Sequence, residues 1–293
     1  AALAMSRPEH MGMIIRVFSE DVINLKPQMP VSLVDPHTGE PVNEPLPEMG
    51  YIVSNLPFVQ HEDFSASNPN VTGVNDQIGS VLGGDVGLDG RSDLCAYIPF
   101  ALWDLLEDGG QLGIIISNSW LSTGWGSTFR TLLRRFFQIK YVITAGNGRW
   151  FKEADVVTNM VVLAKRSSDD IHCGCPSHEQ TCFVTIEERL DSLITVDDCI
   201  DLSKLRRLTA KIRTQVDDPC HMISKETYRQ REMAELEELG LPWSSFFVDC
   251  RPILALSDKL VKADSIFEIA RGERRGWDRM FLPEPNHDIE ECY

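Results

Sequence analysis

The sequence predicts an α/β fold built on a doubly wound, mostly parallel sheet, and three observations favour it. The chain has 293 residues, 43% of them hydrophobic and 25% charged, so it can bury a sizeable core. Residues 112–116 are Leu-Gly-Ile-Ile-Ile, the continuous apolar run typical of a strand buried on both faces. Between residues 92 and 144 amphipathic segments with helical spacing alternate with such apolar runs, the order expected of a sheet covered by helices.

The first fifty residues predict the end of a helix at Ala1–Met5, a short strand and a loop. Met13–Phe18 has the composition of a short strand, and Asp21 follows it closely. No Gly-rich loop, the usual cradle for a nucleoside cofactor, follows an early strand, so we expect the sheet to be incomplete on its N-terminal side. Residues 26–50 contain several Pro and acidic residues and predict a loop.

The next strand, Tyr51 onwards, runs straight into Asn55, Leu56, Pro57 and Phe58. A strand that leaves a parallel sheet in this way opens onto a ligand crevice. The Asn55 side-chain oxygen and the Leu56 carbonyl are in the right order to accept the two hydrogens of an exocyclic amine, which helps to localise the lone pair of the attacking nitrogen. Phe58 can stack on the face of a base. The alternative is a strand that ends in a Pro turn with a buried Phe.

Residues 59–90 are rich in Gly, Asn, Ser and Asp and predict a long loop, which in a compact domain is either functional or disordered. His61, Glu62 and Asp63 lie in this loop. Three adjacent side chains cannot all converge on one ion without further ligands, so we expect no metal there.

Residues 92–144 predict two helices, each followed by a strand. Asp93 is a plausible N-cap for the first helix, whose start Pro99 either delays or kinks. The second helix covers about residues 127–137 and precedes a strand at 139–144. Its three arginines, Arg130, Arg134 and Arg135, predict a basic stripe.

Beyond residue 145 the pattern weakens. Trp150 and Phe151 precede an apolar strand at 156–163. Residues 201–240 predict two charged helices, the second at 226–239, which together form a solvated connector. The cluster of Cys173, Cys175 and Cys182 has zinc-ligand chemistry but lacks paired Cys-x-x-Cys knuckles, so both a zinc site and an exposed connection remain open.

Asn55-Leu56-Pro57-Phe58 resembles the Asn-Pro-Pro-Tyr/Phe signature of S-adenosylmethionine-dependent amino-methyltransferases, especially the adenine-specific DNA methyltransferases of restriction-modification systems. The chain departs from that signature at Leu56, where the family has its first Pro. A Pro there would hold Asn55 in extended geometry, so we expect a less rigid site. The order and spacing of the segments from 93 to 163 are similar to those of type I and type IIG restriction methyltransferases. The methyltransferase-like segments precede a recognition-like region, which matches the gamma arrangement of amino-methyltransferases.

The resemblance implies roles for several residues. S-adenosylmethionine would be the cofactor, contacted by Asn55 and by Asp21, the latter at the adenine ring; a helix-capping Asp21 is the alternative. Phe58 and Phe151 would sandwich a flipped-out adenine, with Trp150 as the alternative to Phe151. A segment like the start of a target-recognition region would place three arginines on DNA phosphates, namely Arg271, Arg274 and Arg275; a charged surface turn is the alternative.

The resemblance also implies the organisation and the partners. Residues 1–200 would be the C-terminal part of a Rossmann-like methyltransferase domain, 201–262 a helical connector and 263–293 the start of a target-recognition region. The chain would methylate the N6 amine of adenine in double-stranded DNA, alongside a restriction or specificity module of a restriction-modification or phage-defence system. The net charge of −16 restricts any DNA contact to local basic patches.

Two other functions remain open. A protein-glutamine N5 methyltransferase uses the same Asn-Pro-Pro-Tyr chemistry on an amide. A methyltransferase-derived scaffold without activity is the non-enzymatic alternative, because the cofactor loop is missing and Leu56 replaces Pro.

The sequence favours a cytoplasmic protein. It has no run of about 18 apolar residues and no charged-then-apolar leader, so no membrane partner is expected. Eight Cys without regular framework spacing fit a reducing compartment better than a disulfide scaffold.

Overall fold

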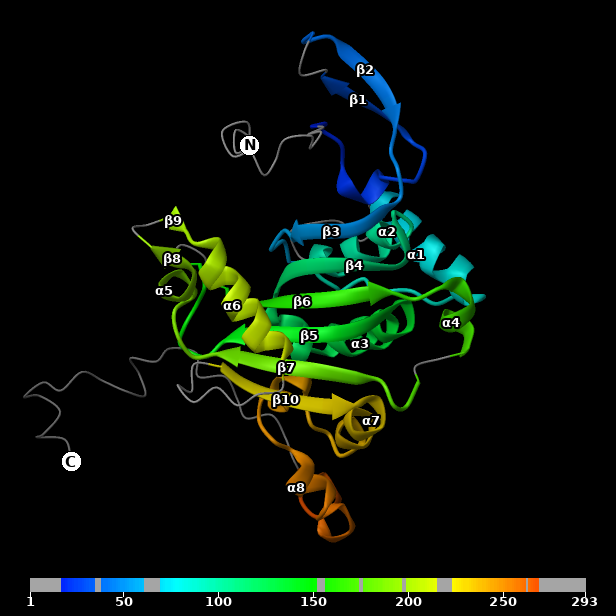
Figure 1. The fold of residues 1–293 in the computed structure, drawn as a ribbon. Coiled ribbons are helices and arrows are strands. Elements are labelled where there is room, and N and C mark those ends of the chain that lie inside the picture. Colours follow the sequence, from blue (N-terminus) through cyan, green and yellow to red (C-terminus); the bar gives the residue numbers. More distant parts are fainter. Residues whose placement is uncertain are drawn as a thin grey trace, which may run out of the picture. The chain divides into compact units, whose positions relative to one another are not determined.

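The computed structural model describes residues 17–34, 38–60, 69–151, 156–173, 176–196, 199–214, 223–261 and 263–268 (Figure 1). The chain divides into two compact units, Ala1–Leu254 and Ala255–Tyr293. This boundary differs from the predicted ones at 200 and 262, because residues beyond 200 join the sheet and core of the first unit. The described residues of the second unit form two short 3-10 helices, Ser257–Lys259 and Ala263–Ser265. Arg271, Arg274 and Arg275 lie outside the described residues.

A six-stranded sheet forms the centre of the first unit. Its strands are β3 (Met49–Asn55), β4 (Leu106–Ser117), β5 (Phe137–Ala145), β6 (Thr158–Lys165), β7 (Gln180–Ile186) and β10 (Ile223–Arg229), in the spatial order β10-β7-β5-β6-β4-β3. The pairs β3–β4 and β5–β7 are parallel, whereas β4–β6, β5–β6 and β7–β10 are antiparallel. The predicted α/β class is confirmed. Four of the six strands, β3, β4, β5 and β7, run in one direction, and only β6 and β10 run the other way, which a buried apolar run does not reveal because its composition is the same in either direction.

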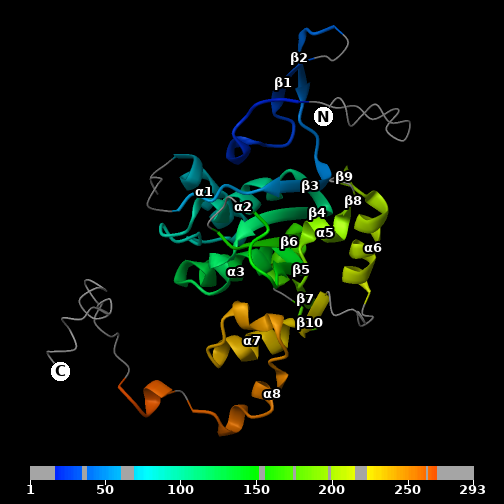
Figure 2. The same cartoon turned by 90° about the vertical axis from the view of Figure 1, so that its left-hand side faces the viewer.

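Helices cover both faces of this sheet, as a doubly wound fold requires. The described α-helices are α1 (Pro69–Leu82), α2 (Ile98–Trp103), α3 (Gly124–Phe136), α4 (Ser168–Cys173), α5 (Leu190–Ile194), α6 (Leu202–Arg213), α7 (Gln230–Glu238) and α8 (Arg251–Leu254). Figures 1 and 2 show α1, α2 and α3 on one face of the sheet and α5 and α6 on the other. None of the described helices is long and apolar enough to cross a membrane.

Two predicted loops contain regular structure. Within 26–50 a hairpin pairs β1 (Pro30–Val34) with β2 (Pro41–Pro45), because the alternate residues Val31 and Leu33 are buried. Within 59–90 the helix α1 buries Val71, Val74 and Ile78, whose spacing is helical. His61, Glu62 and Asp63 lie outside the described residues, as do the predicted helix end Ala1–Met5 and most of the predicted strand Met13–Phe18, of which Val17 and Phe18 belong to no strand.

The α-helix after residue 92 starts later than a cap at Asp93 would place it. A 3-10 turn, η5 (Leu94–Ala96), comes first, and α2 starts at Ile98 with Pro99 in its first turn. The predicted delay by Pro99 is therefore confirmed, because a Pro is accepted where the first N–H groups of a helix have no partner. Asp93 occupies the cap position of η5 but makes no side-chain capping hydrogen bond.

The predicted basic stripe on α3 is wrong, because its arginines turn toward neighbouring elements. Arg130 is buried, and its Nε lies 3.7 Å from Glu237 Oε1 on α7. Arg134 Nη1 lies 2.9 Å from the other Glu237 oxygen, and Arg135 Nη2 donates to the Ile171 carbonyl at 3.4 Å. Burial lowers the pKa of Arg130, and the Glu237 carboxylate opposes that shift.

The predicted solvated connector is likewise part of the core. Residues 223–229 form the edge strand β10, and the helix α7 follows it. The strand was expected to be helical because its charged residues are also typical of a surface helix. Trp243, in the 3-10 turn η7 (Trp243–Phe247), donates to Glu237 Oε1 at 2.7 Å and lies 5.6 Å from the Trp120 ring. Each such aromatic pair contributes about 0.5–1.5 kcal/mol beyond the area that it buries. The helix α6, from the predicted connector, keeps a largely exposed surface.

Candidate functional site

The Asn55-Leu56-Pro57-Phe58 stretch lies where β3 ends. β3 pairs in parallel with β4, and the ladder continues one residue further, because the Leu56 N–H donates to the Ile115 carbonyl at 3.0 Å. The Leu56 side chain is 1% exposed, whereas Asn55 and Pro57 are exposed and Phe58 is 37% exposed. Leu56 therefore anchors the stretch in the core, while its neighbours on both sides face solvent.

Hydrogen bonds fix the backbone on both sides of Pro57. The first is the Leu56–Ile115 bond, and the second joins the Leu94 N–H of η5 to the Val59 carbonyl at 3.1 Å. Among the described residues none donates a hydrogen bond to the Leu56 carbonyl oxygen. The carbonyl is thus held in place by its own strand, with its acceptor capacity available to a ligand.

A row of paired residues connects Asn55 with the end of β5. Asn55 pairs with Ile115 of β4, which pairs with Met160 of β6, which pairs with Ile143 of β5. Neighbouring strands lie about 4.8 Å apart, so Ile143 lies about 14 Å from Asn55 along this row. Because β3, β4, β5 and β7 run in one direction, the loops that follow them leave from the same edge, where Figure 1 shows the ends of β3, β5 and β7.

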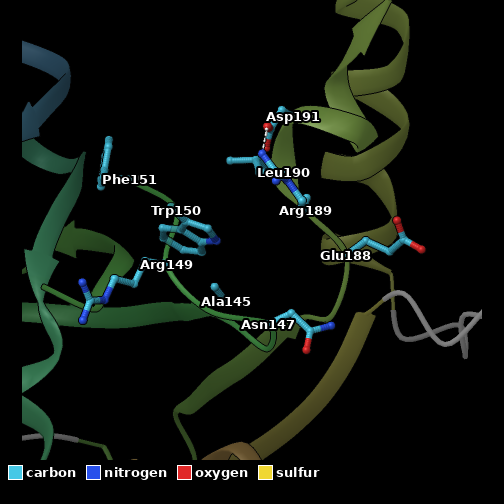
Figure 3. A pocket seen from close by; sticks show the side chains of 9 residues that line it. All are labelled: Ala145, Asn147, Arg149, Trp150, Phe151, Glu188, Arg189, Leu190 and Asp191. Atoms are coloured by element: carbon cyan, nitrogen blue, oxygen red, sulfur yellow. Dashed lines mark hydrogen bonds and ion pairs between the residues drawn. The ribbon is translucent and has the colours of Figure 1, made fainter. Parts of the chain in front are cut away.

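At this edge the loops after β5 and β7 enclose a pocket of about 440 Å³. Its lining residues are Ala145, Asn147, Arg149, Trp150, Phe151, Glu188, Arg189, Leu190 and Asp191 (Figure 3). Two hydrogen bonds tie the loops together: Gly146 N–H donates to the Ile186 carbonyl at 2.8 Å, and Asn147 Nδ2 donates to the Glu187 carbonyl at 2.6 Å. The volume falls within the range of small-molecule sites.

Trp150 and Phe151, the two aromatic residues predicted to stack on a base, both line this pocket but differ in their surroundings. Trp150 packs against a small core cluster that includes Ile143 and Val184, and its buried Nε1 has no hydrogen-bond partner among the described residues. Phe151 is half-buried and packs into neither core cluster of the described residues. In Figure 3 Leu190 lies across the pocket from Phe151, with the Trp150 ring between them. Phe151 is therefore the ring with more of its surface available to a ligand.

The charges of the pocket balance. Its lining includes two cationic side chains, Arg149 and Arg189, and two carboxylates, Glu188 and Asp191. Arg189 Nη2 lies 2.6 Å from Asp191 Oδ2, but both side chains are 60% exposed, so their attraction contributes little to stability. With formal charges that cancel and two aromatic rings, the pocket suits a neutral planar group better than an anion.

Asp21 acts as a helix cap. Its Oδ1 accepts a hydrogen bond from Ile23 N at 3.1 Å, at the start of the 3-10 turn η3 (Val22–Asn24), and its Oδ2 accepts one from Asn70 Nδ2 at 3.1 Å. The capping alternative is therefore what the structure shows for this carboxylate.

The described residues fit one side of a methyl-transfer site. The exposed Asn55 amide and the Leu56 carbonyl are hydrogen-bond acceptors at the sheet edge, and the pocket has aromatic surface. A Gly-rich loop after a strand, which would cradle the nucleoside of S-adenosylmethionine, is not among the described residues. The described residues therefore fit the binding of a methyl acceptor, and they include no cradle for the nucleoside of the cofactor.

No metal centre emerges from the described part of the chain. It contains no group of three His, Cys, Asp or Glu residues placed to hold a metal ion. Of the candidate zinc ligands, Cys173 is exposed, Cys182 is half-buried and Cys175 lies outside the described residues. Burial raises the pKa of Cys182 and raises that of Cys95 to about 12, so neither thiol readily forms the nucleophilic thiolate.

Some residues at this edge of the sheet were not predicted from the sequence to belong to a site. The segment 188–191 lines the pocket, and the signal for it was its position shortly after the apolar residues at the end of β7, which is parallel to β5. Asp93, predicted only as a helix cap, accepts a hydrogen bond from the Ser119 hydroxyl at 3.4 Å, and Ser119 in turn lies 2.7 Å from the Ser117 hydroxyl at the end of β4.

No family model and no curated protein matches the sequence. Among solved structures the fold is similar to the type IIG restriction endonuclease BpuSI, with 16% identity, a TM-score of 0.49 and coverage of 76% of this chain and 22% of that chain. It is also similar to the methyltransferase subunit of a type I restriction-modification system from Streptococcus thermophilus, with 15% identity, a TM-score of 0.45 and coverage of 66% and 36%.

A third similar structure is the M protein of the type I restriction enzyme EcoKI, with 13% identity, a TM-score of 0.39 and coverage of 82% of this chain and 54% of that chain. This chain spans between about a fifth and about a half of the length of these three proteins. At these identities and TM-scores the likeness says nothing of what this chain binds or acts on.

Proposed function

We propose that this chain is the catalytic part of an S-adenosylmethionine-dependent DNA methyltransferase that modifies the exocyclic N6 amine of adenine. One observation carries the proposal: Asn55, Leu56, Pro57 and Phe58 form an anchored, solvent-facing stretch at the same sheet edge as an aromatic pocket whose formal charges cancel. The carboxyl edge of a doubly wound sheet is where such folds bind their ligands.

The chemistry requires an amine to become a better nucleophile. The lone pair of an exocyclic amine is delocalised into the ring, and acceptors for its two hydrogens help to localise that pair on nitrogen. The exposed Asn55 amide oxygen and the Leu56 carbonyl are the proposed acceptors, and Pro57 holds Leu56 in extended geometry. When bound, S-adenosylmethionine supplies the electrophilic methyl group.

The aromatic residues would hold the base while it reacts. Phe58 and Phe151 are proposed to stack on the two faces of a base extruded from the duplex, since any base offers a π-face to such rings. No covalent enzyme intermediate is proposed, because the attacking nitrogen belongs to the substrate.

Finer features of the function belong to the same proposal. Asp21 and Asn55 are proposed to contact the cofactor, and Arg271, Arg274 and Arg275 are proposed to contact DNA phosphates. A restriction or specificity module of the same system is the proposed protein partner.

Transfer of a labelled methyl group tests this function. The chain would be incubated with labelled S-adenosylmethionine and either duplex DNA or a release-factor-like protein. Label recovered as N6-methyladenine is the expected result. Label on a protein glutamine would favour the protein-glutamine methyltransferase instead, and no binding of the cofactor would favour an inactive scaffold.

Alanine substitutions at the two pocket rings are expected to have different effects. Base–aromatic stacking contributes about 1–3 kcal/mol per base, so Phe151→Ala should reduce methyl transfer about ten- to a hundredfold while the melting temperature changes little. Trp150→Ala removes a ring that packs on the small core cluster, so it should lower the melting temperature clearly. Transfer rates and thermal melts of both variants provide the measurement. Full activity in Phe151→Ala would contradict the stacking role.

A further inference from the structure

The helix α6 concentrates positive charge on a chain whose net charge is −16. Its twelve residues, Leu-Ser-Lys-Leu-Arg-Arg-Leu-Thr-Ala-Lys-Ile-Arg, contain no acidic side chain. The basic residues are Lys204, Arg206, Arg207, Lys211 and Arg213. Such a concentration is a local basic patch of the kind that contact with a polyanion requires.

The cations of α6 lie in two rows. Lys204, Arg207 and Lys211 are spaced i, i+3 and i+7 and so share one side of the helix, whereas Arg206 and Arg213 lie on another. Arg206, Arg207 and Arg213 are exposed, and within the described part of the chain none of the three has a hydrogen bond or ion pair. An exposed guanidinium without a carboxylate partner keeps its charge available to a ligand.

The first row, here called the basic row, borders a hollow of about 240 Å³. The remaining lining residues are Ser192, Leu193, Leu208 and Ile223, with no carboxylate among them. Lys204 Nζ donates to the Thr195 carbonyl at 2.8 Å, and its aliphatic stem can lie along the apolar floor. The apolar residues that line the hollow thus pack beside the side chains that carry the charge.

The basic row lies close to the aromatic pocket. α5 has five residues, so it is about 7.5 Å long. Leu190 and Asp191 of this helix line the aromatic pocket, and the next two residues, Ser192 and Leu193, line the hollow beside the basic row. Figures 1 and 2 show α5 and α6 side by side. The two hollows therefore lie on either side of one short helix.

We propose that Lys204, Arg207 and Lys211 bind the phosphates of the nucleic-acid strand whose base enters the aromatic pocket. From Lys204 to Lys211 the helix rises about 10 Å, which corresponds to about three base steps of 3.4 Å along the axis of a duplex. The balanced charges of the pocket suit the base, and a hollow bordered by three cations and lined by no carboxylate suits its backbone. The inference rests on the proposed function for the identity of the strand as DNA.

A pair of double variants with equal loss of charge tests this surface. Arg207→Gln/Lys211→Gln removes two cations of the basic row, and Arg206→Gln/Arg213→Gln removes two from the other side of the same helix. Binding of the full chain to a mixed-sequence duplex would be measured without cofactor across a series of salt concentrations, with thermal melts as a check on folding. The dependence of log affinity on log salt reports the number of phosphates contacted.

The basic-row variant is expected to lose about tenfold in affinity for every duplex sequence, with the salt slope reduced by about 2. The control variant should stay within about twofold of the unmodified chain, because its cations lie away from the strand. Equal losses in both variants, no loss in either, or no DNA binding by the unmodified chain would overturn the inference. So would a basic-row effect seen only with phosphatidylserine vesicles.

The outcomes separate this inference from the proposed function. DNA binding that depends on the basic row, in a chain that transfers no methyl group, would refute the function and support the inference. Methyl transfer to DNA that is unaffected in the basic-row variant would support the function and refute the inference.

Discussion

Asn55→Ala is expected to abolish methyl transfer without unfolding the protein. The substitution removes the side-chain oxygen proposed to accept an amine hydrogen, while the Leu56 anchor stays in place. Removing one such preorganised hydrogen-bonding group typically costs about 10²–10³ in rate. The Asn55 side chain is exposed, so its loss should cost little stability.

The measurement is single-turnover transfer of a labelled methyl group, with a thermal melt of each variant. Val53→Ala is the matched control, because Val53 lies two residues earlier on the same side of β3, is 87% exposed and carries no hydrogen-bonding group. Transfer by Val53→Ala should remain close to that of the unmodified chain. Activity retained in Asn55→Ala would refute the acceptor role.

Two glycines in the first turn of α3 are expected to respond to alanine in opposite directions. A Cβ on Gly126 would overlap the Trp120 carbonyl oxygen and lie 2.8 Å from its carbon. Both atoms belong to the backbone, so η6 (Asn118–Leu121) and α3 would have to separate. Trp120 is fully buried against Phe129 and Trp243, so this separation would disturb the centre of the core. We expect Gly126→Ala to lower the free energy of unfolding by about 3 kcal/mol.

Gly124→Ala supplies the control. A Cβ there meets no atom within 4 Å, and the residue is exposed. Alanine loses less backbone entropy than glycine on folding, so this variant should gain about 0.4–1 kcal/mol. Urea denaturation of the two variants gives both values. If Gly126→Ala were as stable as Gly124→Ala, the close packing of η6 against α3 would be disproved.

Local patterns predicted the elements whose signal lies within a few residues. The apolar run at 112–116 lies in the C-terminal half of β4, and Pro99 delays α2 as expected. Where polar residues interrupt the pattern, prediction failed: the hairpin at 30–45 and the helix α1 were both expected to be loops. In those segments only a few residues are buried, and the elements that they pack against decide which secondary structure forms.

The arginines of α3 illustrate a second limit. Their spacing along the sequence favours an exposed basic stripe, yet Arg130 is buried beside Glu237, 107 positions away. A charged side chain enters a core only where a partner and hydrogen bonds offset its desolvation. Nothing in the sequence around residue 130 contains that partner.

The sequence by itself determined that a strand ends at Asn55 and that Pro57 and Phe58 follow it, because a strand and its termination depend on neighbouring residues. Only the tertiary structure decided the direction of β6, the burial of Arg130 and the meeting of the loops after β5 and β7 in one pocket. Each of these depends on contacts between segments far apart in the chain, whose energies no local pattern contains.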